Sequence, residues 1–203
     1  MARFTIRDAT PADVEAAVSA LAEAFADDPL MAYLYGDDPR GMTGCVKAFF
    51  SILLRVRLEL DMPAMVLERD GEILGAAMGY DTSRPDWPPS LADEWDRFEA
   101  GAPDLPARMA AYDEICTTHQ PGGEHYYLGV IGVHPRLQGQ GAGKALLDAF
   151  CERSRADALS QGVYLDTTNP RSLAFYDRNG FQRRGEGQLD ATPVWCVWLP
   201  TRP

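Results

Sequence analysis

Three glycines at alternate positions, Gly139, Gly141 and Gly143, form the most distinctive pattern in this sequence of 203 residues. They follow an apolar run that ends at Val133 and precede a segment with helical spacing of apolar residues. Because glycine adopts backbone conformations that other residues avoid, such a loop can turn tightly and bring its N–H groups close to a ligand. The helix behind it adds unpaired N–H groups and the positive end of its dipole. The spacing therefore predicts a cradle for phosphate groups.

Two other kinds of glycine-rich loop match this segment poorly. A P-loop has the pattern GxxxxGK followed by Ser or Thr, whereas here Ala145 follows Lys144 and Gln138 stands in place of the first glycine. A dinucleotide-binding loop has the pattern GxGxxG after the first strand of a βαβ unit. Lys144 replaces its third glycine here, and the loop comes late in the chain. The NTPase and dinucleotide-binding interpretations are therefore disfavoured.

A tyrosine in the last third of the chain lies on an expected short helix. Asn169 can cap a short helix, Pro170 suits its first turn, and Gly180 suits its end. Tyr176 follows the cap by about two turns of helix. Its phenol has a proton to donate, or it is a core residue with a satisfied hydroxyl. The residue types alone leave both interpretations open.

The apolar periodicity predicts the elements that must position these residues. Strands are expected near Phe4 and Ile6 and over residues 64–68, 72–80, 126–133, 163–167, 181–188 and 194–199. Helices are expected over about 10–26, 43–60, 141–161 and 170–179. Asp28-Pro29 is expected to follow the end of the first helix, and residues 36–44 to be rich in turns. Strands that alternate with helices in this way favour one mixed sheet in one domain.

Residues 81–123 interrupt this order with six prolines and with helical patches near 91–100 and 104–118. A segment of this length between strands is often a lid or a substrate wall, and an ordinary helical insertion is the alternative. Trp87 and Trp95 favour a wall around a compact substrate.

The glycine loop resembles the signature (Q/R)xxGx(G/A) of the GNAT superfamily of acyl-CoA-dependent N-acyltransferases. Gln138, Gly141 and Gly143 match it in place, after the usual Val-x-Pro at 133–135. The segment 165–181 resembles the second signature of that family. Residues 125–128 and the ending through Trp195-Cys196 are most similar to the puromycin-type antibiotic N-acetyltransferases.

The resemblance implies an α/β (α+β) fold, with one GNAT-type domain over residues 1–203 and a helical insertion at about 81–123. Its sheet would be central, mixed and mostly antiparallel, with six to seven strands flanked by helices. It also implies acetyl-CoA as acyl donor and no metal. The pyrophosphate would lie on the loop, the pantetheine arm along one strand edge, and one further residue would touch CoA. The residues implied are Gln138, Gly139, Gln140, Gly141, Ala142, Gly143 and Lys144 for the loop, Ile131, Gly132 and Val133 for the edge, and Asn169 for the further contact.

The same resemblance assigns catalytic roles to two side chains and one backbone group. Tyr176 would protonate the departing thiolate, and the N–H of Ile131 would stabilise the oxyanion. Glu124, at the start of the strand before the loop, would take the proton of the amine, with His125 beside it. Either may instead be an ordinary residue at a strand end; this alternative stays open. Lys144 may contact a phosphate or be a solvated helix residue.

Composition narrows the class of partner. Nineteen Lys and Arg against 30 Asp and Glu give a formal charge of -11, which disfavours binding to a nucleic-acid backbone. No apolar stretch has the roughly 18 residues needed to span a membrane, and the first residues lack the pattern of a signal peptide. The four cysteines are far apart and form no CxxC pair. These features predict a cytoplasmic protein with no membrane or nucleic-acid partner.

The sequence thus predicts an N-acetyltransferase that moves an acetyl group from acetyl-CoA to a primary amine of a small molecule, by direct attack in a ternary complex. A non-catalytic acyl-CoA-binding or sensing protein and a protein or peptide N-acetyltransferase are the alternatives. The identity of the amine, the length of the acyl group and the oligomeric state are not determined by the sequence.

Overall fold

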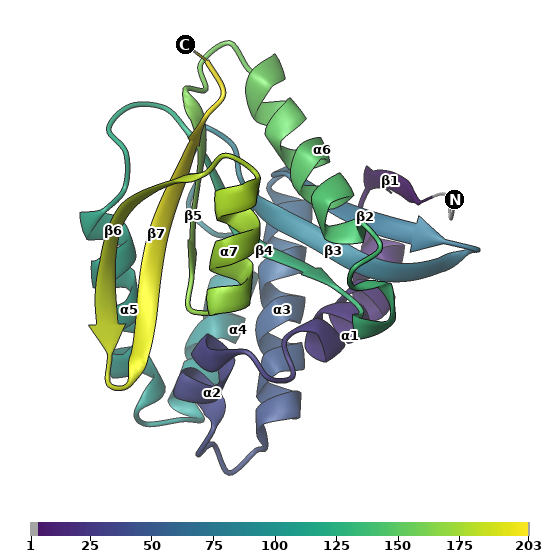
Figure 1. The fold of residues 1–203 in the computed structure, drawn as a ribbon. Helices are drawn as coiled ribbons and strands as arrows, with labels where there is room; N and C mark the ends of the chain where they lie inside the picture. The colour runs from purple at the N-terminus through teal and green to yellow at the C-terminus, as the bar shows by residue number, and fades with distance from the viewer. Residues whose placement is uncertain (1–3, 203) are drawn as a thin grey trace.

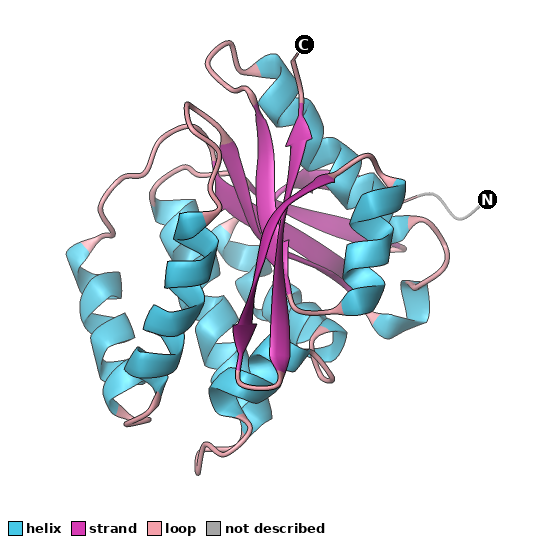
Figure 2. Cartoon of the chain, turned by 60° about the vertical axis from the view of Figure 1, so that its left-hand side comes forward, coloured by secondary structure: helices cyan, strands magenta, loops and turns pink. Residues whose placement is uncertain are grey.

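A computed structural model describes residues 4–202 as a seven-stranded open sheet with helices on both faces (Figures 1 and 2). The strand order is β1-β2-β3-β4-β5-β7-β6. Neighbouring strands are antiparallel except for the parallel pair β4 and β5. The strands are β1 (Thr5–Asp8), β2 (Ala64–Arg69), β3 (Glu72–Tyr80), β4 (Tyr126–Val133), β5 (Gly162–Thr167), β6 (Gln182–Leu189) and β7 (Thr192–Pro200). The expected mixed, mostly antiparallel sheet is confirmed.

Seven α-helices and two short 3₁₀ turns are present in the described part of the chain. The helices are α1 (Val14–Ala24), α2 (Pro29–Tyr35), α3 (Met42–Glu59), α4 (Pro89–Ala100), α5 (Leu105–Thr118), α6 (Ala142–Ala156) and α7 (Pro170–Arg178). The 3₁₀ turns are Pro11–Asp13 and Pro135–Leu137. No helix within residues 4–202 is both long and apolar enough to cross a membrane.

Alternation along the strands divides the core between the two faces of the sheet. On β2, Ala64 and Val66 pack in one cluster with α1 to α4, whereas Met65 and Leu67 pack in another with α6 and α7. This follows from the two-residue period of side chains along a strand. A third cluster places α5 against β5 and β7 through Tyr112, Tyr164 and Cys196.

Two expectations about helices were wrong. The segment that follows Asp28 forms α2, because the Asp28 carboxylate caps it, accepting from Leu30 N at 3.0 Å and Met31 N at 3.3 Å. Asp28-Pro29 therefore starts a helix rather than merely following one. Helix α6 ends at Ala156 rather than near residue 161. Asp157 leaves the helical conformation, and the guanidinium of Arg202 donates to its carbonyl at 2.8 Å.

Candidate active site

The parallel strands β4 and β5 separate soon after they meet (Figure 1). They pair only at Tyr126 with Val163 and at Tyr127 with Tyr164. Beyond this point β4 stays paired with β3 on its other side as far as Val133. The register of β3 and β4 shifts at Met78 and Gly79, which is a bulge, and a bulge bends its strand. The separation leaves one edge of β4, from Leu128 onward, without a neighbouring strand.

The free edge carries the backbone groups of Ile131 and Val133. His134 N donates to Leu74 O on β3 at 2.8 Å, and alternate residues of a strand direct their N–H and C=O groups to opposite sides. Gly132 therefore faces β3, as His134 does. Ile131 and Val133 direct their backbone groups into the gap between β4 and β5, where an extended amide chain can pair with them.

The glycine loop joins this edge to the N-terminus of α6. Gly139 and Gly141 have φ angles of 75° and 84°, which lie in the left-handed region. The amides of Gln138 and Gln140 donate to carbonyls within the loop, at 3.1 and 3.2 Å. The remaining amides, from Gly139 and from Gly141 to Lys144, are the ones available to an anion at the helix start. The loop thus has the tight turns that its glycine spacing predicted, and its role as a phosphate cradle stays a prediction.

The side chains of the loop are partly engaged with one another. Lys144 Nζ pairs with Asp148 at 2.5 Å, one turn along α6. Gln140 accepts from Arg69 at 3.1 Å and donates to the Arg136 carbonyl at 2.7 Å. In this conformation Lys144 is an exposed helix residue whose ammonium pairs with Asp148. This agrees with the interpretation of Lys144 as a solvated helix residue.

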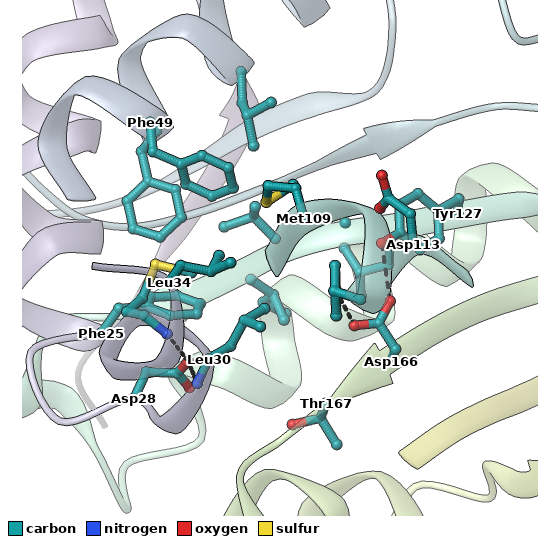
Figure 3. A pocket seen from close by; sticks show the side chains of 18 of the residues that line it. Phe25, Asp28, Leu30, Leu34, Phe49, Met109, Asp113, Tyr127, Asp166 and Thr167 are labelled. Carbon is teal, nitrogen blue, oxygen red and sulfur yellow. Dashed lines mark hydrogen bonds between the residues drawn. The ribbon is translucent and has the colours of Figure 1, made fainter. Parts of the chain in front are cut away.

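A cavity of about 600 Å³ lies where β4 and β5 separate (Figure 3). Residues of β4 and β5 line it, together with residues of α2, α3, α4, α5 and α7 and with Phe25, which follows α1. The lining is mainly aromatic and aliphatic and includes Ile131 and Tyr176. From the 81–123 segment it includes Trp87, Ala92, Trp95, Asp96, Met109, Tyr112 and Asp113. The segment therefore forms a wall of the cavity, as one of its two interpretations predicted.

Asp166 is a polar residue of the cavity lining that accepts hydrogen bonds from two tyrosines. Tyr127 donates to its Oδ1 at 2.9 Å, and Tyr112 donates to its Oδ2. Burial raises the pKa of Asp166 above its ordinary value, although the two hydrogen bonds act in the opposite direction. Each carboxylate oxygen has capacity for a further hydrogen bond, so Asp166 can accept one from a ligand.

Asp28 provides a second carboxylate in the cavity (Figure 3). Its Oδ1 caps α2, and burial raises its pKa, with Asp166 adding to that shift. Asp113 is exposed and lies at the rim. These three residues were not among the predicted site residues. The cap sequence Asp28-Pro29 was a readable signal for α2, and Asp166 lies within the 165–181 segment that resembles the second family signature, but no pattern gave either carboxylate a role.

Tyr176 lies on α7 with its side chain in the cavity lining, 6% exposed. Its ring packs against Phe175 and Phe181. Within residues 4–202 its hydroxyl makes no hydrogen bond to another side chain. Burial, followed by the carboxylates of Asp166 and Asp28, raises the pKa of Tyr176 above its ordinary value. The phenol is therefore protonated at neutral pH and free to bind a ligand.

The structure separates the other predicted site residues. Asn169 caps α7, accepting from Arg171 N at 3.0 Å, so the predicted cap is present. Glu124 precedes β4, is exposed, and is not among the residues that line the cavity. Its distance along the chain from Ile131 explains this, because a strand rises about 3.3 Å per residue. His125 is buried against Tyr164 and Trp198, also outside the lining.

Comparison with known proteins identifies the family. The Acetyltransferase (GNAT) family model matches residues 20–181, which is most of the chain. The protein therefore belongs to the GNAT family of acetyltransferases. A crystal structure of histone acetyltransferase HPA2 and related acetyltransferase from Corynebacterium glutamicum is 26% identical, with a TM-score of 0.70. It covers 100% of this chain, and this chain covers 99% of it.

Two further relatives are more distant. A GNAT acetyltransferase from Brucella melitensis in complex with acetyl-CoA has a TM-score of 0.57 and 19% identity, with 100% of this chain and 91% of that chain covered. A mycothiol acetyltransferase of Streptosporangium roseum is 39% identical over 66 residues, which are 32% of this chain and 19% of the relative. The chain thus spans about a fifth of that curated relative. The narrower likeness to puromycin-type enzymes stays a prediction.

Proposed function

We propose that the protein transfers an acetyl group from acetyl-CoA to a primary amine of a small molecule. The observation that carries this proposal is that one cavity contains the free edge of β4 at Ile131, the phenol of Tyr176 and the carboxylate of Asp166. An acyltransferase needs a place for the acyl donor, a proton donor for its leaving group and a site for the amine, and these three features supply them in one space.

The donor side of the proposal rests on the gap between β4 and β5 and on the glycine loop. The loop amides from Gly139 and from Gly141 to Lys144 would hold the pyrophosphate, and the edge at Ile131 to Val133 would pair with the pantetheine amides. The N–H of Ile131, which points into the gap, would donate to the acyl oxygen. Acetyl-CoA would supply an activated thioester. The remaining chemistry falls to residues of this chain.

The acceptor side rests on the carboxylates and the aromatic walls. A primary alkylammonium has a pKa near 10.4 and must lose a proton before it attacks. Asp166 would bind the ammonium and take this proton, directly or through water. The nitrogen would then form its bond to the acyl carbon as the carbon–sulfur bond breaks. Tyr176 would donate its proton to the departing sulfur, and the second proton that the nitrogen loses on becoming an amide would restore the phenol, directly or through water. Direct attack needs no acyl-enzyme.

A small acceptor is preferred over a protein because α4 and α5 wall the cavity. Trp87, Trp95 and Met109, all from or beside these helices, lie in its lining. A peptide backbone would need an open groove across this side of the sheet. The names of the relatives refer to different acceptors, so the preference for a small acceptor over a protein rests on the walls of the cavity.

Calorimetric titration with acetyl-CoA tests the donor half of the proposal, with free CoA and ATP as comparisons. We expect acetyl-CoA to bind and ATP to bind far more weakly. A panel of small amines and of peptides with free amino termini, assayed by release of CoA thiol, tests the acceptor half. If folded protein does not bind acetyl-CoA, the donor assignment is wrong. Turnover with peptides alone would reject the small-molecule acceptor.

A further inference from the structure

The cavity wall contains a buried cation that has no anionic partner among residues 4–202. Arg57, on α3, lines the cavity and is 5% exposed. No salt bridge in the described part of the chain involves it. Its Nε and Nη1 are buried without a hydrogen-bond partner among residues 4–202. Because buried charges are almost always paired, such a residue in a cavity wall calls for a ligand group that pairs with it.

Aromatic rings hold the Arg57 guanidinium in place. Its Cζ lies 4.1 Å from the centre of the Tyr80 ring and 5.9 Å from that of Trp87. Cation–π contacts of this kind stabilise a guanidinium over its flat face. They leave the N–H groups, which lie in the plane of the group, free to donate. The fork of donors matches the geometry of a carboxylate.

The positive charges of Arg57 and of the nearby Arg84 favour the binding of an anion beside them. Arg84 lies on the same ring, with its Cζ 5.4 Å from the centre of Tyr80. Its own donors are used by carbonyls, including Ser83 O at 2.7 Å and His125 O at 3.1 Å. Within residues 4–202 no side-chain carboxylate is bonded to either guanidinium, although the charges of Asp81 and Glu124 act on Arg84. Burial lowers the pKa of Arg57, but an arginine stays protonated in proteins.

Two carboxylates line the same cavity as Arg57. Asp166 and Asp28 both raise the pKa of Tyr176. Tyr127, whose hydroxyl donates to Asp166, also lines this cavity. A molecule that spans the cavity therefore meets carboxylates near the catalytic tyrosine and a cation near Tyr80. Aromatic and aliphatic side chains line the space between them.

We infer that the acceptor is an amino carboxylate with an apolar skeleton, whose ammonium binds at Asp166 and whose carboxylate pairs with Arg57. This inference rests on the proposed acetyltransferase function and narrows its acceptor class. Arg57 is then a specificity-determining residue rather than part of the proton transfer.

The first test uses matched acceptors that differ only in the carboxylate. 4-Aminobutanoate and 6-aminohexanoate are each compared with their neutral amides, at fixed saturating acetyl-CoA, with thiol release as the readout. We expect kcat/KM to favour at least one of the acids by about tenfold or more, because bidentate pairing with a carboxylate is strong. Turnover of amines without any preference for the acids overturns the inference and leaves the proposed function intact. Absence of all turnover, with no binding of acetyl-CoA, defeats the proposed function instead.

The second test replaces Arg57 with methionine, which has a similar length and no charge. We expect Arg57→Met to reduce the acid-to-amide ratio of kcat/KM to about one. Arg55→Met is the matched control, since Arg55 is on the same helix, pairs with Glu94 and does not line the cavity. It should retain the wild-type ratio.

Thermal unfolding with the preferred acid, without acetyl-CoA, gives a readout independent of turnover. The acid should raise the Tm of the wild type and of Arg55→Met but not of Arg57→Met. If Arg57→Met instead loses affinity for acetyl-CoA and keeps the acid preference, the residue serves the donor and the inference fails.

Discussion

The hydroxyl of Tyr127 donates a 2.9 Å hydrogen bond to Oδ1 of Asp166, and this contact joins β4 to β5 just past their last pair. The bond fixes the carboxylate at the point where the two strands separate. The gap proposed for the acyl donor and the carboxylate proposed for the amine therefore share one structural cause. Three variants, each with a control, test how this arrangement works.

Replacing Tyr176 by phenylalanine removes only the phenol oxygen. We expect Tyr176→Phe to lower kcat by about one to three orders of magnitude, with acetyl-CoA affinity nearly unchanged, because the hydroxyl acts on the leaving group. Steady-state kinetics measure kcat, and calorimetry measures the affinity for acetyl-CoA. Tyr164→Phe is the control, since its hydroxyl donates to Cys116 O at 2.6 Å, away from the cavity lining. Unchanged turnover of Tyr176→Phe in a chemically limited assay would remove the phenol from its role.

Replacing Asp166 by asparagine keeps the shape of the side chain and removes its charge. We expect Asp166→Asn to lower kcat/KM for the amine by about a hundredfold, because the proton acceptor and the anion at the ammonium are both lost. Glu124→Gln is the matched comparison and should retain activity, because Glu124 lies outside the cavity lining. The opposite pattern, with Glu124→Gln impaired and Asp166→Asn active, would restore the assignment that the sequence suggested.

Asp166 also predicts a pH dependence of stability. Burial raises its pKa in the folded state, so the folded protein holds this proton more tightly than the unfolded chain does. Its contribution is complete below the unfolded value of about 3.9 and is lost as pH rises through the folded pKa. We therefore expect the free energy of unfolding of Asp166→Asn, relative to wild type, to increase as pH rises above about 4. Urea titrations of both proteins at a series of pH values measure this difference in the free energy of unfolding.

Asp13 supplies the control of opposite sign. Hydrogen bonds from Arg7, at 2.7 and 2.8 Å, lower the pKa of its carboxyl. Its contribution is present above the unfolded value and is lost as pH falls through the folded pKa. Asp13→Asn should therefore be less stable than wild type at neutral pH, and the difference should shrink below about pH 4. A constant difference between Asp166→Asn and wild type across the whole range would contradict the burial of that charge.

Gly141 tests the loop through its backbone. An alanine at its φ of 84° is strained by about 1–2 kcal/mol, and relief of that strain would turn the loop amides away from the phosphates. We expect Gly141→Ala to weaken acetyl-CoA binding by about tenfold or more in calorimetry. Gly71→Ala is the matched control, because Gly71 has a φ of 80°, lies in the β2–β3 turn and also faces open space. It should lose similar stability and keep donor affinity; equal donor affinity in both variants would separate the loop from CoA.

The sequence alone was enough to predict the sheet, most of the helices and the glycine loop. Each of these depends on short-range spacing, such as the alternation along β2 or the cap at Asn169, and such spacing reports the local backbone directly. Helix α2 was missed although Asp28-Pro29 carries the same kind of cap signal. Helix α6 was predicted too long because Arg202, distant in the chain, contributes to ending it.

The tertiary structure decided which charged groups share the cavity. Glu124 looked suitable by its place at the start of a strand, yet Asp166 lies where β4 and β5 separate, and no local pattern distinguished it. Asp28 was expected only to follow a helix, and Arg57 lay within an expected helix with no role assigned to it. Their environment depends on contacts between segments far apart in the chain, and side-chain spacing within one segment carries no information about such contacts. The chain thus determined its elements locally, whereas burial, pKa shifts and the missing partner of Arg57 arise only when those elements pack.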